Sequence, residues 1–392
     1  MLSVTRLLCG SPTPGDDIRY GESVHGERPK PIHSRPVVVW NVTRRCNLHC
    51  AHCYSTSQDR EYPGELTGDE ARVVIDDLAG FGIPALLFSG GEPTVRRDLA
   101  DLIAYSIKAG LKPVVSTNGT LLDRARVHDL SLAGLNRVGI SLDGLRASHD
   151  KFRGSPGAFD LSLAGIRNSI AAGMRVSLRV TMTKYSLPDL PGLFDLAEAE
   201  GVGRLCVYHL AYAGRGRQLL RFDLDAEERR RALDFIFRRT LQSQITGKNL
   251  EVLTVDNHAD GPYLLLWSRQ HAPDRTVEIE RLLRRNGGNS AGKGIACIDN
   301  VGEVHPDQFW WNRKLGNVRD RPFSQIWTDD GIQFLSDLRN RQSLLAQRCH
   351  DCRWLPMCNG NLRVRAETAT GNPWGLDPAC YLTADEIQRE VA

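Results

Sequence analysis

Six short β-rich runs, each separated from the next by a longer amphipathic stretch, constrain the fold of this chain more than any other feature. The runs occupy residues 36–43, 84–92, 113–120, 137–144, 175–183 and 204–212. Between the first two, Thr67 and Glu70 form a capping box that predicts a helix start, and Gly80 or Gly82 predicts its end. Strands that alternate with helices predict a parallel sheet. We therefore expect an α/β fold of six β/α units, an open partial barrel with its functional residues at the carboxyl ends of the strands.

The rest of the sequence predicts three further segments around this barrel, which we place at residues 36–213. Residues 1–35 are rich in Pro, Gly and charge without periodicity, and they predict an irregular N-terminal lead-in. Residues 214–288 are helical in pattern and highly charged, which predicts a helical connecting segment. Residues 289–392 are irregular and contain five of the ten cysteines, which predicts a small domain organised by something other than a large apolar core.

The overall charge is nearly balanced, because 50 Lys and Arg face 47 Asp and Glu, a net charge of +3. No global field therefore favours nucleic acid or an anionic membrane as a partner. No apolar run is long enough to cross a bilayer, and the first residues lack the order of a secretory signal. We expect a cytoplasmic location, where thiols stay reduced and cysteines bind metal more often than they form disulfides.

Cys46, Cys50 and Cys53 form a C-x3-C-x2-C array directly after the first predicted strand. Three thiolates so close together are ligands for zinc or for an iron–sulfur cluster. Zinc requires a fourth ligand, which His49 or His52 would supply. The array by itself therefore leaves both metals open.

A second cysteine set near the C-terminus has the pattern C-x2-C-x5-C with a distant fourth member: Cys349, Cys352, Cys358 and Cys380. Four thiolates suit a closed iron–sulfur site, and they are also a zinc signature. Cys297 remains nearby as either a buried thiol or a ligand that replaces one of the four. We interpret Cys9 and Cys206 as structural.

The first cysteine array is followed by an aromatic residue, and the stretch "SGGEP" ends the next strand. Together these features resemble the radical S-adenosylmethionine (radical SAM) family. The resemblance implies that Cys46, Cys50 and Cys53 hold three irons of a [4Fe-4S] cluster, and that the fourth iron is left for the amino and carboxylate groups of SAM. The reduced cluster then passes an electron to SAM, and the deoxyadenosyl radical that forms takes a hydrogen atom from the substrate.

The same resemblance implies a set of SAM-binding residues at the ends of successive strands: Tyr54, Gly90, Gly91, Glu92, Asn118, Ser141, Asp143 and Arg153. Glycines allow a close approach to a ligand, and an arginine binds a carboxylate through two hydrogen bonds. A turn role for Asn118, Ser141 and Asp143, and a solvated Arg153, stay open as alternatives. The stretch "YAGRG" at residues 212–216 is a candidate to flank the adenine.

The second cysteine set resembles the SPASM extension of radical SAM enzymes, which carries auxiliary [4Fe-4S] clusters. The full SPASM pattern has more cysteines than this chain offers. We therefore predict one auxiliary cluster bound by the four cysteines of the second set, with zinc as the alternative.

Stretches from nearly the whole chain, among them "CGSPTPGDDIRYG", "TVDNHADGPY" and "DPACYLT", resemble radical SAM enzymes that modify siroheme-derived rings. One group removes two acetate side chains from 12,18-didecarboxysiroheme to give iron-coproporphyrin III. A related group acts on propionate side chains of the same precursor in heme d1 biosynthesis. The N-terminal stretch, "TVDNHADGPY" and Cys297 favour the first group, whereas "IDNVGEVHPDQFWW" shares features with the second. The resemblance implies an iron-tetrapyrrole substrate, hydrogen abstraction from a ring substituent, and an electron donor such as flavodoxin or ferredoxin.

A ring with several carboxylates favours arginines that grip them and aromatic walls for its face. The candidate arginines are Arg215, Arg217, Arg221, Arg353, Arg363 and Arg365. The candidates to approach the ring iron are His209, His258 and His305. Two other interpretations stay open: a SPASM enzyme that modifies a peptide with the same two clusters, and a zinc-stabilised binding module without catalysis.

Overall fold

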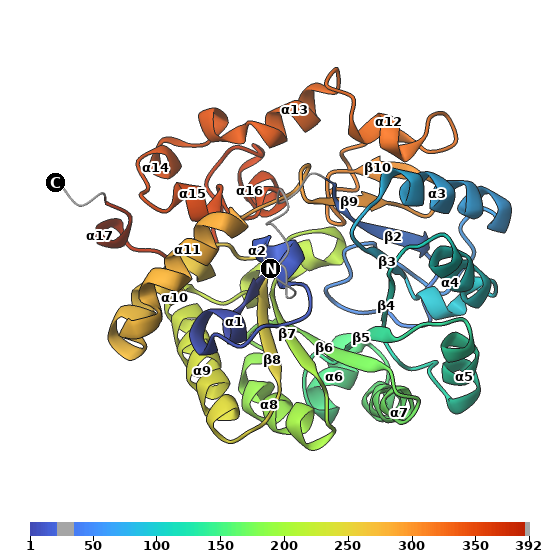
Figure 1. The fold of residues 1–392 in the computed structure, drawn as a ribbon, viewed down its shortest axis with the longest axis horizontal. Coiled ribbons are helices and arrows are strands. Elements are labelled where there is room, and N and C mark those ends of the chain that lie inside the picture. The colour runs from blue at the N-terminus through green and yellow to red at the C-terminus, as the bar shows by residue number, and fades with distance from the viewer. Residues whose placement is uncertain (22–34, 389–392) are drawn as a thin grey trace.

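The computed structural model describes residues 1–21 and 35–388, which form a curved sheet with helices around it (Figure 1). The strand order is β1-β8-β7-β6-β5-β4-β3-β2-β9-β10-β11. All neighbours from β8 to β9 in that order are parallel, whereas β1, β10 and β11 pair antiparallel. The strands are β1 Leu2–Ser3, β2 Val37–Thr43, β3 Leu86–Gly90, β4 Pro113–Thr117, β5 Arg137–Ser141, β6 Arg175–Met182, β7 Arg204–His209, β8 Glu251–Val255, β9 Ile295–Ile298, β10 Glu303–His305 and β11 Gly316–Asn317.

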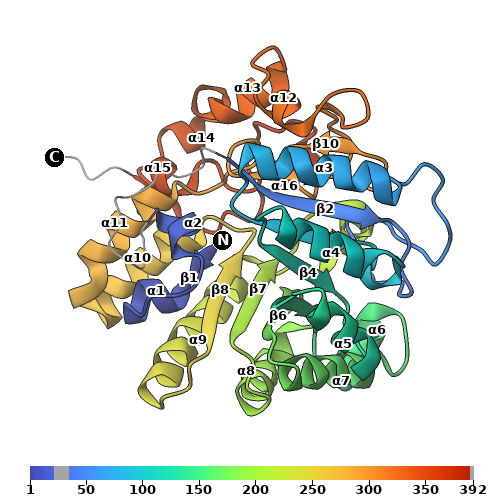
Figure 2. The same cartoon turned by 45° about the vertical axis from the view of Figure 1, so that its right-hand side comes forward.

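Helices cover the outer side of the parallel strands, and the C-terminal helices form an arc that runs from β10 to the helices at residues 260–286 (Figures 1 and 2). The helices of the first half are α1 Val4–Cys9, α2 Asp16–Tyr20, α3 Gly68–Phe81, α4 Leu99–Lys108, α5 Arg124–Leu132, α6 Arg146–Arg153, α7 Ala158–Ala171 and α8 Leu190–Ala199. Those of the second half are α9 Ala226–Ile245, α10 Asp260–His271, α11 Thr276–Asn286, α12 Phe323–Trp327, α13 Gln333–Arg339, α14 Gln347–His350, α15 Leu355–Cys358, α16 Arg363–Thr370 and α17 Ala384–Ile387.

Side-chain patterning explains why the sheet is apolar outside and polar inside. In α3, the buried positions Ala71, Val74, Ile75 and Leu78 form one apolar face. In β6, Val176, Leu178, Val180 and Met182 are buried in the main apolar core. The alternate residues of this strand face the opposite way, toward the interior of the curved sheet. The interior is therefore the place where polar side chains gather.

The predicted partial barrel is confirmed, since the six predicted runs contain β2 to β7 in sequential order. The capping box is confirmed too: Thr67 accepts from the Glu70 N–H, the Glu70 side chain accepts from the Thr67 N–H, and Gly82 ends α3 at φ 75°. Two parallel strands were not predicted. β8 lies next to β7, and β9 from the C-terminal region lies next to β2.

Two expectations for the segments outside residues 36–213 were wrong in content. In the lead-in 1–35, residues 1–21 contain β1, α1 and α2, because the apolar face of α1 packs against β8 and α9, and α2 with its buried Tyr20 packs against α11. Residues 22–34 of that prediction lie outside the described residues. The connecting segment 214–288 is not purely helical, because it contains β8. The segment boundaries themselves stay a prediction.

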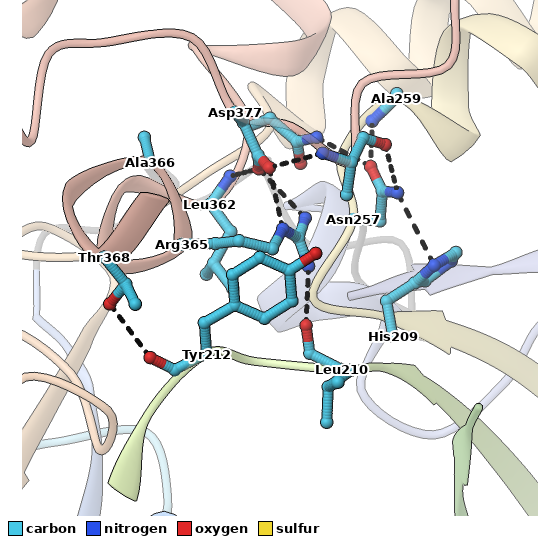
Figure 3. A network of polar contacts seen from close by, with 12 residues as sticks. His209, Leu210, Tyr212, Asn257, Ala259, Leu362, Arg365, Ala366, Thr368 and Asp377 are labelled. Atoms are coloured by element: carbon cyan, nitrogen blue, oxygen red, sulfur yellow. Dashed lines mark hydrogen bonds and ion pairs between the residues drawn. The ribbon is translucent and has the colours of Figure 1, made fainter. Parts of the chain in front are cut away.

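Polar contacts fix the C-terminal region to the carboxyl ends of β7 and β8 (Figure 3). Arg365 on α16 is fully buried; it binds both carboxylate oxygens of Asp377 at 2.7 and 2.9 Å and donates to the Leu210 carbonyl at 3.0 Å. The Thr368 hydroxyl donates to the Tyr212 carbonyl at 2.9 Å. These contacts hold α16 against the segment that follows β7.

In the described part of the chain, no helix combines the length and the apolar character that a membrane crossing requires.

Candidate functional site

A cavity of about 170 Å³ lies inside the curved sheet at the carboxyl ends of its strands. Its walls come from β2 through β8 and from the segment after β10, which contributes Gln308 and Phe309. Four of the residues predicted to contact SAM line it: Tyr54, Ser141, Asp143 and Arg153. The position agrees with the rule that parallel strands present their functional residues at their carboxyl ends.

The first cysteine set converges in the loop after β2. Cys46, Cys50 and Cys53 form a small cluster with Leu48 and Ala158. The three thiols lie close enough to interact electrostatically, and burial, the largest cause, raises the pKa of Cys46 to about 12. Such a pocket disfavours free thiolates, so a positively charged metal group is the partner that would stabilise them.

The stretch "YAGRG" packs against this cysteine loop and forms hydrogen bonds with it. Arg215 donates from its backbone N–H to the Cys53 carbonyl at 2.9 Å, and its guanidinium donates to the carbonyls of Cys50 and Ser57 at 2.8 and 2.9 Å. A Cβ at Gly214 would lie 2.3 Å from the Tyr54 carbonyl oxygen, so only glycine permits this approach. Arg215 is therefore a positioning residue that holds the cysteine loop in place.

Gly90 and Gly91 let the end of β3 pass directly against the start of the same loop. A Cβ on Gly90 would lie 2.2 Å from the Thr43 carbonyl oxygen, and one on Gly91 would lie 2.2 Å from that of Arg45. The backbones join through the Gly91 N–H to the Thr43 carbonyl at 2.8 Å, and the Glu92 N–H to that of Arg45 at 2.9 Å. The motif thus fixes the distance between β3 and the cysteine loop.

Glu92 is fully buried and does not line the cavity. Its carboxylate accepts from the Thr94 N–H and hydroxyl, from the Thr117 hydroxyl and from the Asn118 N–H at 2.6 to 3.0 Å. Burial raises the pKa of this carboxyl above its ordinary value. The side chain therefore ties β3 to β4, and a direct contact with SAM stays a prediction.

Arg153 and Asp143 form a buried ion pair beside the cysteine loop. Arg153 also donates to the Cys50 sulfur at 3.4 Å, and Asp143 accepts from the Thr181 N–H at 2.6 Å. Burial acts to raise the pKa of Asp143, but Arg153 with other donors holds it below its ordinary value. His52 lies 3.6 Å from the same carboxylate, and burial lowers the pKa of His52 to about 4, so the imidazole is neutral at pH 7.

Tyr54 and Asn118 make hydrogen bonds close to the first cysteine set. The Tyr54 hydroxyl donates to the Asn41 side-chain oxygen at 2.9 Å and lies 3.3 Å from the Ser89 hydroxyl. The Asn118 amide donates to the Asn47 side chain at 2.9 Å and lies 4.0 Å from the Cys46 sulfur. Both residues therefore contact the cysteine loop or its neighbours.

The four cysteines of the second set, Cys349, Cys352, Cys358 and Cys380, lie near one another and interact electrostatically. Burial, the largest cause, raises the pKa of the Cys358 thiol well above its ordinary value. Cys297 lies elsewhere: it is fully buried in β9, and its sulfur accepts from the Asn41 amide at 3.3 Å. The structure thus favours a buried thiol for Cys297.

Both cysteine sets fit a metal cluster in the chemistry of their donors, since each gathers thiols in a pocket that burial makes unfavourable for free thiolates. The Arg153 Nε and the His52 Nδ1 beside the first set are buried without a hydrogen-bond partner, so both atoms are free to hydrogen-bond to a bound ligand. Among the described residues, no three His, Cys, Asp or Glu side chains lie close enough together to bind a single metal ion as they stand.

Most of the arginines and histidines predicted for the ring have other partners or lie outside the cavity. Arg363 and Arg365 are buried and bind backbone carbonyls or Asp377, Arg353 lies over the Trp354 ring, and Arg217 and Arg221 are exposed. Of the candidate histidines, His209 alone lines the cavity, and its Nε2 lies 2.9 Å from Asp260. His258 is buried, and His305 contacts Asp299 and the Arg313 carbonyl.

Sequence reasoning missed four polar cavity residues on or directly after the last strands: Arg179 and Thr181 on β6, Tyr208 on β7 and Asp256 directly after β8. Asp256 has a left-handed backbone with φ 66°, and burial, the largest cause, raises the pKa of its carboxyl to about 7. The signal for Arg179 was its alternation with apolar residues in "RVSLRVTM".

Two family models match the sequence. Residues 40–197 match the radical SAM superfamily, and residues 290–353 match the SPASM iron–sulfur cluster-binding domain. Curated relatives cover nearly the same length. The chain is 49% identical to the Fe-coproporphyrin III synthase of Methanosarcina barkeri over 99% of both chains. It is 43% identical to the pre-heme d1 synthase of Dinoroseobacter shibae, over 90% of this chain and 87% of that protein.

Solved structures share the fold at low sequence identity. SuiB of Streptococcus suis with bound S-adenosylmethionine has a TM-score of 0.68 at 18% identity, over 89% of this chain and 78% of SuiB. The enzyme anSMEcpe with bound AdoMet and a peptide also gives 0.68 at 18% identity, over 88% of this chain and 94% of that one.

Proposed function

Because the chain belongs to the radical SAM superfamily and carries a SPASM iron–sulfur domain, we propose a reaction of that family for it. In this reaction the protein removes the two acetate side chains of 12,18-didecarboxysiroheme to give iron-coproporphyrin III. The observation that carries the proposal is the 49% identity over 99% of both chains with an Fe-coproporphyrin III synthase. A heme d1 enzyme that acts on the propionates is the second candidate, because the pre-heme d1 synthase is 43% identical over 90% of this chain.

In this proposal Cys46, Cys50 and Cys53 hold a [4Fe-4S] cluster, and the second cysteine set holds an auxiliary one. When bound, the first cluster and SAM together supply the removal of a hydrogen atom from a ring substituent. The loop contacts of Arg215, Gly90 and Gly91 support this role, because they fix the thiols relative to the strand ends.

The cavity residues position SAM and shield the reacting carbon from water. Arg153 and Asp143 form the polar wall beside Cys50, and Ser141 and Tyr54 complete it. His52 stays neutral and stacks on Phe152 with ring centroids 4.6 Å apart, so it excludes water without adding charge. The position of the cavity inside the curved sheet supports this shielding.

Flavodoxin or ferredoxin would supply the electron, and the cytoplasm, where thiols stay reduced, is the compartment we propose. A peptide substrate is a weaker candidate. Fold neighbours such as SuiB have bound a precursor peptide, but they share only 18% identity with this chain.

The test is an anaerobic turnover of reconstituted protein with SAM, dithionite and 12,18-didecarboxysiroheme, followed by mass spectrometry of the ring and of deoxyadenosine. Loss of two acetate units is the expected result. Altered propionates would move the protein to the heme d1 reaction, and deoxyadenosine with an unchanged ring would exclude this substrate. Cys50→Ala should abolish turnover. The matched control Cys206→Ala, a buried thiol within β7 outside both cysteine sets, should retain it.

A further inference from the structure

Arg179 is a cation on the inner wall of the barrel. It lies on β6 beside Ser141 of β5 and Cys206 of β7 in the strand register, and it lines the cavity. Residues on either side of it in β6 point outward into the apolar core. The side chain therefore extends into the cavity from a rigid strand.

Two neighbouring strands hold the guanidinium in place. A Cβ on Gly139 of β5 would lie 2.4 Å from the Arg179 Nε and 2.5 Å from its Cζ, so the glycine leaves the space that the guanidinium occupies. The Arg179 guanidinium donates a hydrogen bond to the Ser116 hydroxyl on β4. The Arg179 side chain therefore passes over Gly139 of β5 to reach Ser116 of β4, and these contacts fix its orientation.

No acidic side chain in the described residues forms an ion pair with Arg179, and its Nε is buried without a hydrogen-bond partner. The other cavity arginine, Arg153, is already paired with Asp143. Two groups that sense the Arg179 charge, Cys206 and Tyr208, stay neutral at pH 7 because burial, the largest cause, raises the pKa of each. The two acids that line the cavity do not pair with Arg179, because Asp143 binds Arg153 and Asp256 forms no ion pair with Arg179. A part-buried cation without such a partner is unfavourable until an anion joins it.

We propose that Arg179 is a specificity-determining residue that binds a carboxylate side chain of the ring substrate, with Gly139 and Ser116 orienting its guanidinium. The planar guanidinium matches a carboxylate in geometry, which a lysine ammonium does not. The inference rests on the proposed function, because a siroheme-derived ring is the ligand that brings several carboxylates to this cavity.

The experiment measures ring binding to reconstituted holoenzyme without reductant, so that no turnover occurs. 12,18-Didecarboxysiroheme and the carboxylate-free iron octaethylporphyrin are each titrated in one detergent buffer and followed by Soret absorbance. Arg179→Met should weaken binding of the carboxylate ring about tenfold or more, the usual effect of losing a charge-assisted hydrogen bond. Binding of the carboxylate-free ring should change less than about threefold.

Three further variants separate a ligand contact from a structural role. Arg175→Met removes an exposed arginine at the start of the same strand and should leave both affinities unchanged. Arg179→Lys keeps the charge without the planar fork and should give an intermediate loss, and it reports on the site if Arg179→Met does not fold. Gly139→Ala should weaken only the carboxylate ring, because the new methyl group displaces the guanidinium.

The outcomes distinguish the inference from the function on which it rests. Equal weakening of both rings in Arg179→Met would overturn the inference in favour of a structural role. Loss of SAM binding, measured by equilibrium dialysis, with ring binding intact would overturn it in favour of the SAM carboxylate. A wild-type protein that binds no carboxylate ring would remove the proposed function itself, and the inference with it.

Discussion

Individual residues in this site act mainly through the backbone distances they permit. Gly91 has no conformational need for glycine, since its φ is not in the left-handed region, yet the Arg45 and Arg44 carbonyl oxygens lie within 2.6 Å of where a Cβ would stand. Backbone oxygens cannot move aside as a flexible side chain can. The second glycine of the motif is therefore a spacing residue between β3 and the cysteine loop.

Gly91→Ala should destabilise the protein by about 2–3 kcal/mol, the cost of overpacking against rigid neighbours. It should also lower the iron content, because the cysteine loop must shift. Anaerobic urea denaturation and iron analysis measure both effects. Gly80→Ala is the matched control: nothing lies within 4 Å of its Cβ position in α3, and alanine in a helix should stabilise by up to about 1 kcal/mol. Equal behaviour of the two variants would contradict the spacing role.

Asp256 should make ring binding depend on pH. Burial, the largest cause, raises the pKa of this carboxyl to about 7. The charges of the Met1 amino group and of Arg365 on α16 lower this pKa, and that of Asp307 after β10 raises it. Below pH 7 the acid is neutral, and above pH 7 it becomes an anion that repels the carboxylates of the ring. Affinity for iron-coproporphyrin III should therefore fall as the pH rises from 6 to 8, and Asp256→Asn should flatten this slope. An unchanged slope in the variant would count against Asp256.

At the scale of elements, the sequence predicted the six strands that alternate with helical patterns in residues 36–213 and missed β8 and β9, which lie outside that range. β8 is a five-residue run, "EVLTV", with every residue buried, and it lies between the charged helix α9 and the largely buried helix α10. A short run that is buried at every position has no period that separates a strand from a helix segment. Its position beside β7 follows from tertiary pairing, and with it comes Asp256, which could not be predicted as a cavity residue without that strand.

The attachment of α16 to the barrel rests on the pair of Arg365 and Asp377, whose side chains are 0% and 1% exposed. Arg365→Met should leave Asp377 as an uncompensated buried charge and cost about 3–5 kcal/mol. The double variant Arg365→Met with Asp377→Leu should recover part of that loss, and a double-mutant cycle in urea measures the coupling. The exposed pair of Arg231 and Glu227 on α9 is the comparison, where Arg231→Met should cost less than about 0.5 kcal/mol.

At the scale of the whole molecule, one fold carries two cysteine sets that are about 300 residues apart in the sequence. Spacing predicted both sets as metal ligands, because ligands close in sequence leave a pattern, whereas the choice of iron–sulfur clusters came from the resemblance to a family. The cavity inside the sheet was only partly predictable. Residues at the ends of β2 to β5 belong to recognisable motifs, whereas Arg179 and Asp256 are single side chains whose surroundings come from packing.

Metal content tests this two-set organisation directly. If each set binds one [4Fe-4S] cluster, anaerobically reconstituted protein should contain about eight irons per chain. Replacing Cys46, Cys50 and Cys53 by Ala should leave about four, and replacing the second set should also leave about four, because the sets have no cysteine in common. Iron, sulfide and zinc analysis with electron paramagnetic resonance provides the measurement.

Cys297→Ala is the decisive variant in that series. The Cys297 sulfur is buried in β9, apart from the second set, and accepts a hydrogen bond from the Asn41 amide of β2. The variant should therefore keep about eight irons and both resonance signals. A fall to about four irons would make Cys297 a ligand and would require one of the four cysteines to be released from that role. Four irons and one zinc in the wild type would instead restore the zinc interpretation of the second set, since a closed four-thiolate site accepts either metal.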